Sequence, residues 1–521
     1  MNTPLPSTIG ATLAEAAVRR GSASACIDGD HAYSYADLDA SAQQVACGLL
    51  ALGLVRGDRI GIAALNQLEW LQLFYGAAQI GVTVVGMSLR YRDSELEYMV
   101  ADSEVKFVFT LGEHADFDFF AMWDRLAPRL PTLQGVIGIN RRSSASAACL
   151  ADLLATPLAP QVLARAMAEV LETDLAMVIY TSGTTGRPKG AGLTHHSMLA
   201  SARAQAAHMR LNEDDRLTLP MPLNHVGGIT CGILSMLIGG GCIDLIAEFK
   251  AAHVLDRMAL HPPTIVGGVP TMMTLLLMDT QQRAIDWQRV RLVYVGGSNV
   301  DATLLAQLQA RMPKAALMNL YGLSESSGAL VMTPWDCTSD DLMNTIGKPI
   351  GDGAVRVLTA DGAVLPSGEV GELCYRGAGV IAGFVGSAAA KPALDAEGWL
   401  HSGDLGVVDS RGVITLKGRS RDMFIQGGFN VYPVEVETFI SRHPKVMMVA
   451  GIGVPDPMMG EIGRYYIVAK PGADLSAAEL TRFCREQLAD YKVPRQIVLR
   501  DELPLTPAGK IHKAALRNEG G

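Results

Sequence analysis

Short apolar runs alternate with segments of helical periodicity in two parts of this 521-residue chain. Residues 35–52 have helical spacing, 59–64 form an apolar run, and 68–80 have helical spacing again. The same alternation returns between residues 265 and 312. Strands that alternate with helices in this way form parallel sheets covered by helices. We therefore predict an α/β fold with glycines at its strand ends, where open α/β sheets bind ligands.

The length of the chain predicts more than one folded unit, because a typical domain holds about 100–200 residues. From about residue 352 the sequence changes to short β-prone pieces separated by turn signals. This predicts a β-rich subdomain at about 350–420. Helix-like and strand-like segments then resume after Arg421. We predict a large N-terminal domain over residues 1–420 and a small, mobile α+β C-terminal domain over residues 421–521.

Composition and charge exclude several classes of protein. Hydrophobic residues make up 49% of the chain and charged residues only 19%, which is typical of a folded protein. The net charge of −9 argues against a nucleic-acid partner, which would require a basic face. The eight cysteines show no metal-ligand spacing, and no apolar stretch is long enough to span a membrane. The N-terminus also lacks a secretory signal. We expect a cytoplasmic protein with reduced cysteines.

A loop rich in hydroxyls and glycines at residues 181–190 reads TSGTTGRPKG. An apolar run at 175–180 predicts a strand before it, and residues 197–209 predict a helix after it. Glycines let backbone N–H groups turn toward an anion, the hydroxyls are further donors, and Lys189 adds charge. A flexible linker would not stand between two core elements. A Walker loop needs Gly before its Lys and Ser or Thr after, but Pro188 and Gly190 stand there. The segment is predicted to bind polyphosphate in another way.

This loop is the first of several motifs that follow one another along the chain. They are TSGTTGRPKG at 181–190, PLNHVGG at 222–228, GGS at 296–298, YGLSE at 321–325, SGD at 402–404, GRSRD at 418–422 and PLTPAGK at 504–510. The ordered set resembles the adenylate-forming superfamily of acyl-CoA synthetases, adenylation domains and firefly luciferase. The resemblance spans nearly the whole chain and favours the acyl-CoA ligase branch.

The resemblance implies a two-step reaction. Members of the superfamily join a carboxylic acid to ATP, which releases pyrophosphate, and then transfer the acyl group of the adenylate to the thiol of coenzyme A. We therefore expect an AMP-forming acid–thiol ligase that uses ATP, Mg²⁺ and CoA. Three alternatives stay open: an adenylation enzyme that loads a carrier protein, an enzyme of the thioester half-reaction only, and a non-catalytic nucleotide-binding protein. The first would need an acidic group near Asn224 and His225 to pair with an amino acid, and none is found there.

The resemblance also implies roles for individual residues. Lys510, with a Mg²⁺ ion held by Glu325, would stabilise the negative charge that accumulates around the α-phosphorus. Thr184, Lys189 and His225 complete the catalytic set. The implied nucleotide-binding residues are Thr181, Ser182, Gly183, Thr184, Thr185, Gly186, Lys189, Gly297, Ser298, Tyr321, Gly322, Ser324, Asp404, Arg419 and Lys510. Within this set Tyr321 would stack on adenine, and Asp404 and Arg419 would bind the ribose hydroxyls.

The remaining implied sites concern the acid and the thiol. His225 would position the carboxylate, as one of the acyl-pocket residues His225, Val226, Gly297, Leu320, Gly322 and Ser327. Because several of these are small, we expect a roomy pocket for a medium-chain, aromatic or cyclic acid. Gly427 and Gly428 would lie on the CoA side, and Arg421 at the hinge about which the C-terminal domain rotates. The expected partners are the acid and CoA, with a second copy of the chain as a further candidate.

Overall fold

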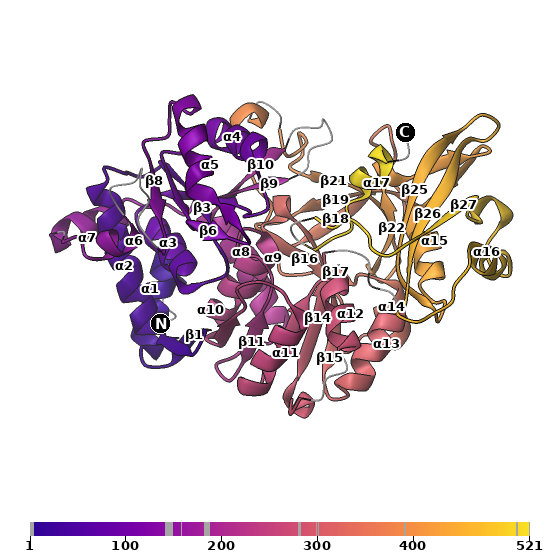
Figure 1. Ribbon diagram of the computed structural model, residues 1–521, viewed down its shortest axis with the longest axis horizontal. Coiled ribbons are helices and arrows are strands. Elements are labelled where there is room, and N and C mark those ends of the chain that lie inside the picture. Colours follow the sequence, from indigo (N-terminus) through magenta and orange to yellow (C-terminus); the bar gives the residue numbers. More distant parts are fainter. Residues whose placement is uncertain are drawn as a thin grey trace.

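The computed structural model describes residues 5–140, 149–157, 159–181, 188–279, 283–297, 300, 302–389, 392–506 and 509–519. It has two large sheets with helices around them, followed along the chain by a four-stranded and a five-stranded sheet (Figure 1). The predicted fold class, α/β with a large N-terminal and a small C-terminal domain, is confirmed. None of the described helices is long and apolar enough to cross a lipid bilayer.

The first large sheet has seven strands in the order β20-β10-β9-β4-β3-β5-β8. Its central strands are parallel, whereas β10 is antiparallel to β9 and β20 is antiparallel to β10. The bounds are β3 (Arg59–Ala63), β4 (Thr83–Met87), β5 (Phe107–Thr110), β8 (Gly135–Gly138), β9 (Leu175–Thr181), β10 (Lys189–Thr194) and β20 (Phe384–Val385).

The second large sheet has nine strands in the order β17-β16-β15-β14-β13-β11-β12-β1-β2. The six strands from β15 to β1 are parallel, and antiparallel strands close both edges. The bounds are β1 (Ser24–Asp28), β2 (His31–Ser34), β11 (Arg216–Leu219), β12 (Cys242–Leu245), β13 (Ile265–Gly268), β14 (Leu292–Gly296), β15 (Ala316–Leu323), β16 (Gly328–Met332) and β17 (Lys348–Pro349).

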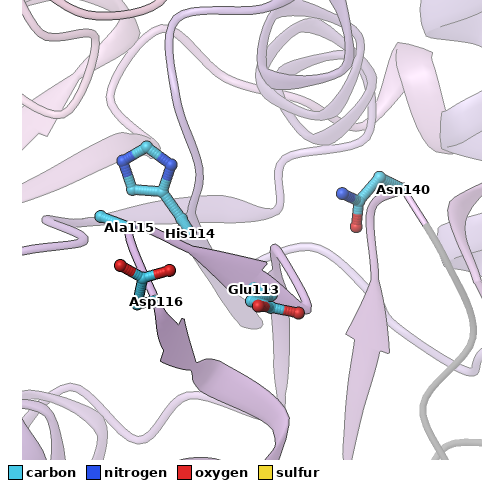
Figure 2. Close-up of a pocket in the computed structure, with 5 residues that line it drawn as sticks. All are labelled: Glu113, His114, Ala115, Asp116 and Asn140. Carbon is cyan, nitrogen blue, oxygen red and sulfur yellow. The ribbon is translucent and has the colours of Figure 1, made fainter.

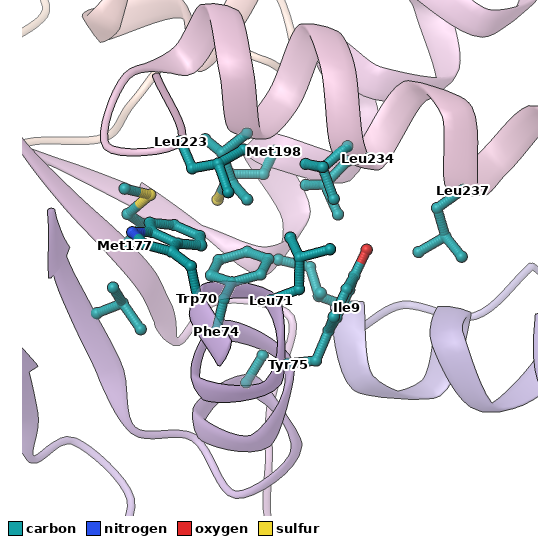
Figure 3. Packing of buried hydrophobic residues seen from close by; sticks show 14 of the residues in the cluster. Ile9, Trp70, Leu71, Phe74, Tyr75, Met177, Met198, Leu223, Leu234 and Leu237 are labelled. Atoms are coloured by element: carbon teal, nitrogen blue, oxygen red, sulfur yellow. The ribbon is translucent and has the colours of Figure 1, made fainter. Parts of the chain in front are cut away.

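Helices between the two large sheets share their main hydrophobic core. Figure 3 shows Trp70 and Phe74 of α3 packed with Met177 of β9 and Met198 of α8, and the two rings lie 5.7 Å apart. The helices on this side are α1 (Ile9–Arg20), α2 (Tyr35–Ala51), α3 (Leu68–Gln79), α6 (Leu150–Leu154), α7 (Pro160–Ala168), α8 (His195–His208), α9 (Val226–Gly228) and α10 (Ser235–Gly239), with a π-helical segment at Ile229–Leu234. The core therefore joins both sheets into one body.

The outer faces have separate hydrophobic clusters. On the seven-stranded sheet the covering helices are α4 (Asp93–Asp102) and α5 (Phe119–Leu126), with the small hairpin β6 (Glu113–His114) and β7 (Phe117–Asp118) nearby. On the nine-stranded sheet they are α11 (Ala251–Leu260), α12 (Pro270–Met278) and α13 (Ala302–Arg311), with α14 (Ser339–Asn344) beside them. This layering is the one that the alternating sequence pattern predicts.

Several strands were not predicted from the sequence, and β10 is the one that adjoins the predicted phosphate loop. The helix expected at residues 197–209 is present as α8, but strand β10 precedes it and forms an antiparallel hairpin with β9. Gly190 and Gly192 give β10 a low β-propensity. They allow close packing instead, because a Cβ atom at Gly190 would lie 2.6 Å from Val385 Cγ2. Tertiary packing therefore overrides local propensity here.

The two smaller sheets follow in sequence. The four-stranded sheet is antiparallel, with β18 (Ala354–Leu358), β19 (Gly371–Arg376), β21 (Leu400–Val408) and β22 (Ile414–Arg419). The five-stranded sheet has β23 (Phe424–Gln426), β24 (Phe429–Val431), β25 (Val446–Asp456), β26 (Gly460–Ala469) and β27 (Gln496–Arg500), with helices α15 (Pro433–Ile440), α16 (Ala477–Arg485) and α17 (Lys513–Asn518). Arg421 lies in the 3-10 turn Ser420–Asp422 between these sheets, and we propose it as the domain boundary.

Candidate active site

A buried carboxylate organises the first part of the site. Asp404 on β21 is 6% exposed, and its Oδ2 accepts a 2.6 Å hydrogen bond from Tyr321 Oη on β15. Arg419 Nε lies 2.9 Å from Asp404 Oδ1, because the β21–β22 register pairs these two residues. Burial raises the pKa of the Asp404 carboxyl, and the charge of Arg419 and the hydrogen bond from Tyr321 oppose that rise. The network ties the four-stranded sheet to β15 of the nine-stranded sheet.

Lys510 reaches this network from the far end of the chain. Its loop is closed by the Lys510 N–H, which donates to Thr506 Oγ1 at 3.1 Å, and by the Gly509 N–H, which donates to the Thr506 carbonyl at 2.9 Å. Desolvation and the charge of Arg419 lower the pKa of Lys510 to about 8, against the opposing charges of Asp404 and Glu325. Side chains from four separate motifs, namely Lys510, Arg419, Asp404 and Glu325, therefore share one electrostatic environment.

The loop of Lys510 also contacts the end of the parallel sheet. A Cβ atom at Gly297, which has φ +83°, would lie 3.1 Å from Lys510 Cε and 3.3 Å from Val269 Cγ1. A Cβ atom at Gly509 would lie 3.4 Å from Val269 Cγ2 and 3.7 Å from Met272 Cε. Gly297 therefore leaves space for the lysine stem at the carboxyl end of β14.

His225 lies within the electrostatic reach of Lys510 and is neutral. Its Nδ1 accepts a 3.1 Å hydrogen bond from the Gly227 N–H at the start of α9. The imidazole proton must then be on Nε2, which leaves that atom as a donor. Desolvation and the charge of Lys510 lower the pKa of His225 to about 3. At neutral pH the ring can therefore donate one hydrogen bond but adds no charge.

Four residues expected in the acyl pocket also have structural roles, in strand pairing, hydrogen bonding or core packing. A Cβ atom at Gly322 would lie 2.0 Å from the Gly328 carbonyl oxygen, so this glycine is required by the close pairing of β15 and β16. Ser327, at φ +55°, donates through Oγ to Ser197 Oγ at 2.9 Å. Leu320 pairs with Gly296, and Val226 is buried in the main core.

The chain matches known families along most of its length. The family described as AMP-binding enzyme matches residues 13–385, and its C-terminal domain family matches residues 435–510. The chain belongs to the AMP-binding enzyme family. Similar proteins include the 3-[(3aS,4S,7aS)-7a-methyl-1,5-dioxo-octahydro-1H-inden-4-yl]propanoyl:CoA ligase of Mycobacterium tuberculosis, 32% identical over 95% of this chain and 96% of the relative. A feruloyl-CoA synthase of an Amycolatopsis species is 32% identical over 96% of each chain.

Solved structures lead to the same family. The anthranilate CoA ligase AuaEII in complex with anthranoyl-AMP superposes with a TM-score of 0.89 at 26% identity, over 99% of this chain and 98% of that one. The ATP-bound MatB of Rhodopseudomonas palustris gives 0.86 at 28% identity over 98% of both chains. The expected superfamily, its acyl-CoA ligase branch and the enzyme class, an AMP-forming acid–CoA ligase, are thereby confirmed.

Part of the predicted phosphate loop of this AMP-binding enzyme lies outside the described residues. These are Ser182, Gly183, Thr184, Thr185 and Gly186, together with Ser298 of the GGS motif. The residues at the two ends of the loop are described. Thr181 and Lys189 form the strand pair of the β9–β10 hairpin that is nearest to the loop. Lys189 Nζ lies 5.3 Å from the centre of the Phe384 ring on β20. The roles implied for the loop residues stay predictions.

In the described part of the chain, the predicted thiol and hinge residues make no hydrogen bond to Asp404, Tyr321 or the Arg419 side chain. Gly427 and Gly428, at φ +59° and +88°, form the two-residue turn between β23 and β24. This is the conformation of a tight hairpin, which glycine adopts without strain. Arg421 is exposed, although its charge still acts on Asp404. Among the described residues, neither segment is hydrogen-bonded to Lys510.

Sequence reasoning about the AMP-binding enzyme missed several supporting residues. Thr506 holds the Lys510 loop through its side chain, and Val269 and Met272 form the surface on which that loop packs. Tyr375 places its ring 5.6 Å from that of Tyr321. A Thr four residues before Lys510 is a signal of such a loop, because Thr hydroxyls cap turns. Val269, Met272 and Tyr375 belong to none of the sequence motifs.

A surface pocket elsewhere on the enzyme is unrelated to these residues. Figure 2 shows its lining, which is Glu113, His114, Ala115, Asp116 and Asn140, and its volume is about 420 Å³. His114 Nε2 lies 3.0 Å from Glu248 Oε1 at its side. None of the predicted site residues lines this pocket, so we assign it no part in the reaction.

Proposed function

We propose that this enzyme activates a medium-chain, aromatic or cyclic carboxylic acid with ATP and transfers the acyl group to CoA. The observation that carries the proposal is the position of Lys510, which lies among Asp404, Arg419, Gly297 and His225. Lys510 is the cation, the Asp404 carboxylate can accept hydrogen bonds from ribose hydroxyls, and His225 is a neutral donor. This combination suits the attack of a substrate carboxylate on the α-phosphate of ATP. Asp404 and Arg419 would hold the ribose of the nucleotide, and His225 would face the acid.

Lys510 supplies positive charge where negative charge develops. Attack on the α-phosphorus crowds anionic oxygens around one centre, so a fixed cation lowers the barrier. At neutral pH most of the Lys510 side chains carry that charge, because the pKa is about 8. The ion pair between the buried Asp404 carboxylate and the half-buried Arg419 side chain orders the polar surroundings of the lysine.

Glu325 fits the proposed Mg²⁺ site. It lies in the 3-10 turn Ser324–Ser326 at the end of β15, half-buried, and its charge acts on Lys510 and Arg419. A carboxylate oxygen is a hard ligand of the kind that Mg²⁺ prefers. A bound Mg²⁺ would neutralise phosphate oxygens. Glu325 holds its main chain in place through its carbonyl, which accepts from the Ile381 N–H at 2.9 Å.

His225 acts as a positioning residue and not as a base in this proposal. A ring with a pKa of about 3 cannot take up a proton at neutral pH. Its Nε2–H can still donate to a carboxylate oxygen of the acid. Because AMP is a good leaving group, the second step also has little need for a dedicated base.

The names of the relatives support the class of acid. One relative acts on a bicyclic propanoate and another on ferulate, and the structural neighbour AuaEII holds anthranoyl-AMP. Each of these acids is built on a ring. The same names favour CoA over a carrier protein as the acyl acceptor.

The partial reactions test this proposal. ATP–pyrophosphate exchange, AMP release and thioester formation would be measured over a panel of aromatic, cyclic and straight-chain acids with Mg²⁺ and CoA. Lys510→Ala is expected to lower the exchange rate by about 100–1000-fold, the range found when one preorganised charge-stabilising group is removed. Lys470→Ala, in the same domain, is the control and should keep the wild-type rate.

Two results would contradict the proposal. Exchange that survives in Lys510→Ala would remove the lysine from the first step. Purified wild-type protein that forms neither AMP nor a thioester with any acid of the panel would refute the proposed function as a whole.

A further inference from the structure

A thiol, an imidazole and a carboxylate meet on the four-stranded sheet. Cys374 Sγ lies 3.6 Å from His401 Nδ1, and the same nitrogen lies 2.9 Å from Glu372 Oε2. One potential metal-ligand atom from each of the three residues lies within 4.8 Å of the others. None of these residues is among those assigned above to ATP, the acid or CoA. The group is called the Cys-His-Glu cluster below.

The pairing of β19 with β21 brings the Cys-His-Glu cluster together. Cys374 on β19 is the direct cross-strand partner of His401 on β21. Glu372 lies two residues before Cys374, so both side chains are on one face of their strand. Because Cys374 and His401 are 27 residues apart, the sequence shows no ligand spacing between them. The cluster is visible only once the strands are paired.

The surrounding groups orient two of the three potential ligands. Glu372 Oε1 accepts a 3.0 Å hydrogen bond from the Gly403 N–H, which leaves Oε2 directed toward His401. His401 Nε2 lies 3.5 Å from Asp395 Oδ2. A carboxylate beside this nitrogen favours the tautomer with its proton on Nε2, so that the lone pair of Nδ1 faces Cys374 and Glu372. Metal-binding histidines commonly have such a carboxylate behind them.

The Cys-His-Glu cluster is closed on the protein side and open toward solvent. Cys374 is 0% exposed, whereas the side chains of His401 and Glu372 are 44% and 28% exposed. Burial and the charge of Glu372 raise the pKa of the Cys374 thiol to about 12, so the thiol keeps its proton in the metal-free protein. A divalent cation takes the place of that proton, which goes to solvent.

The charges around the cluster favour a cation. Arg356 is the basic group that acts on Cys374, but it forms ion pairs with both Asp395 and Glu397. Its positive charge is therefore already balanced. The Glu372 carboxylate and the thiolate formed on binding then balance the two charges of a divalent ion.

We propose that Cys374 Sγ, His401 Nδ1 and Glu372 Oε2 bind a zinc ion, with solvent in the fourth position. In a tetrahedral site with ordinary zinc bond lengths, sulfur and nitrogen ligands lie about 3.6 Å apart, which is their separation here. Nitrogen and oxygen ligands lie about 3.4 Å apart in such a site, so the Glu372 oxygen moves outward by about 0.5 Å. Thiolate and imidazole ligands select zinc over Mg²⁺.

The zinc ion links β19 to β21 beside the residues that carry the Asp404 network. The β19–β21 register shifts between Glu372 and Cys374, where Gly403 has φ +70°. Asp404 follows Gly403 directly. Bulges of this kind re-aim side chains and weaken the local pairing. A zinc ion at this point is expected to stabilise the folded sheet. The inference does not depend on the proposed function.

Metal titrations of the purified full-length enzyme, without ATP, test the inference. After treatment with a chelator, Zn²⁺ binding would be measured by competition with a chromophoric chelator in millimolar Mg²⁺. We expect one zinc ion per chain with a Kd below about 1 μM. Co²⁺ in place of Zn²⁺ should give a thiolate-to-cobalt charge-transfer band, which reports the sulfur ligand directly.

Three variants remove the ligands one at a time. Cys374→Ala should abolish the charge-transfer band and weaken Zn²⁺ binding at least tenfold. His401→Gln and Glu372→Gln should each weaken binding at least tenfold as well, because even the groups behind metal ligands contribute about 10–100-fold in affinity. Glu372→Gln retains an amide oxygen that can accept from the Gly403 N–H, so this variant keeps the local hydrogen bond.

Cys337→Ser and His114→Gln are the matched controls. Cys337 is a free, partly exposed cysteine, and His114 Nε2 lies 3.0 Å from Glu248 Oε1. In the part of the chain that the structure describes, neither residue belongs to a group of three potential metal ligands. Both controls should bind Zn²⁺ as the wild type does. Zn²⁺ should also raise the thermal midpoint of the wild type and the controls but not that of Cys374→Ala. Midpoints without metal show that each variant is folded.

Three results would overturn the inference. The first is a wild-type Kd for Zn²⁺ weaker than about 1 μM, as expected if the Cys-His-Glu cluster is only a hydrogen-bonded network. The second is an unchanged affinity in all three ligand variants, and the third is a charge-transfer band that persists in Cys374→Ala. Each of them leaves the proposed function in place, because ATP–pyrophosphate exchange and thioester formation are measured separately.

Discussion

Burial lowers the pKa of His195 to about 4, because the ring is enclosed in the core and the Ile9 N–H donates to its Nδ1 at 3.2 Å. The unfolded chain binds a proton at this residue below its ordinary pKa of 6.5, whereas the folded chain does not until about pH 4. The free energy of unfolding therefore falls as the pH is lowered from 6.5 to 4, by about 3 kcal/mol from this residue. Thermal midpoints measured across that pH range would show the slope.

His196, the next residue, provides the control for this prediction. Its side chain is 51% exposed and faces Glu172. His195→Gln, which keeps an acceptor for the Ile9 N–H, is expected to flatten the slope, while His196→Gln should leave it steep. An equal slope in the wild type and His195→Gln would assign the acid sensitivity to other groups.

Individual residues were predictable where a motif contains them. Lys510, Asp404, Arg419 and Gly297 belong to ordered motifs, and the structure brings them together. Val269, Met272 and Tyr375 were not predictable, because an apolar or aromatic residue in an apolar segment carries no signal of its own.

The hairpin of β23 and β24 leads to a prediction at the scale of one element. A Cβ atom at Gly428, which has φ +88°, would have no heavy atom within 4 Å, so alanine there meets only backbone strain of about 1 kcal/mol. If the turn serves the thiol step, Gly428→Ala should slow thioester formation from the adenylate by more than tenfold. Single-turnover transfer from a preformed adenylate to CoA would measure this.

Gly472 is a matched control in the same domain. It has φ +75° and equally open surroundings. Gly472→Ala should lose the same amount of stability but transfer the acyl group at the wild-type rate. Equal transfer rates in the two variants would exclude the β23–β24 turn from the thiol step.

Helices and strands were predictable to the extent that their own sequence shows periodicity. The strands near residues 59, 83, 265 and 292 and the helices that follow them are found as α/β units. Strand β10 was missed because Gly190 and Gly192 weaken its pattern, and contacts with β9 and Val385 compensate. Whether a segment with such a weak pattern forms a strand depends on pairing partners that are distant in sequence.

In the proposed mechanism Lys510 serves the first reaction and the Gly427–Gly428 turn serves the second. If the small domain must rotate about Arg421 between the two steps, fixing that residue should stop the second step alone. Arg421→Pro locks one backbone angle. We expect it to keep ATP–pyrophosphate exchange within about threefold of wild type and to lower overall thioester formation more than tenfold.

Arg421→Lys keeps both charge and backbone freedom and should show neither effect. Overall turnover that survives in Arg421→Pro would place the hinge elsewhere. A loss of exchange in the same variant would indicate that the turn Ser420–Asp422 supports the Asp404 network directly, through the charge of Arg421.

Because the charge of Lys510 acts on His225, the pKa of His225 depends on the position of the small domain. The ammonium charge holds down the pKa of the imidazole. If the small domain rotates as proposed and carries that charge away, the pKa of His225 should rise toward the value that desolvation alone sets. An NMR titration of the His225 ring nitrogens in isotopically labelled protein would then follow the rotation of the C-terminal domain in solution, without an attached dye.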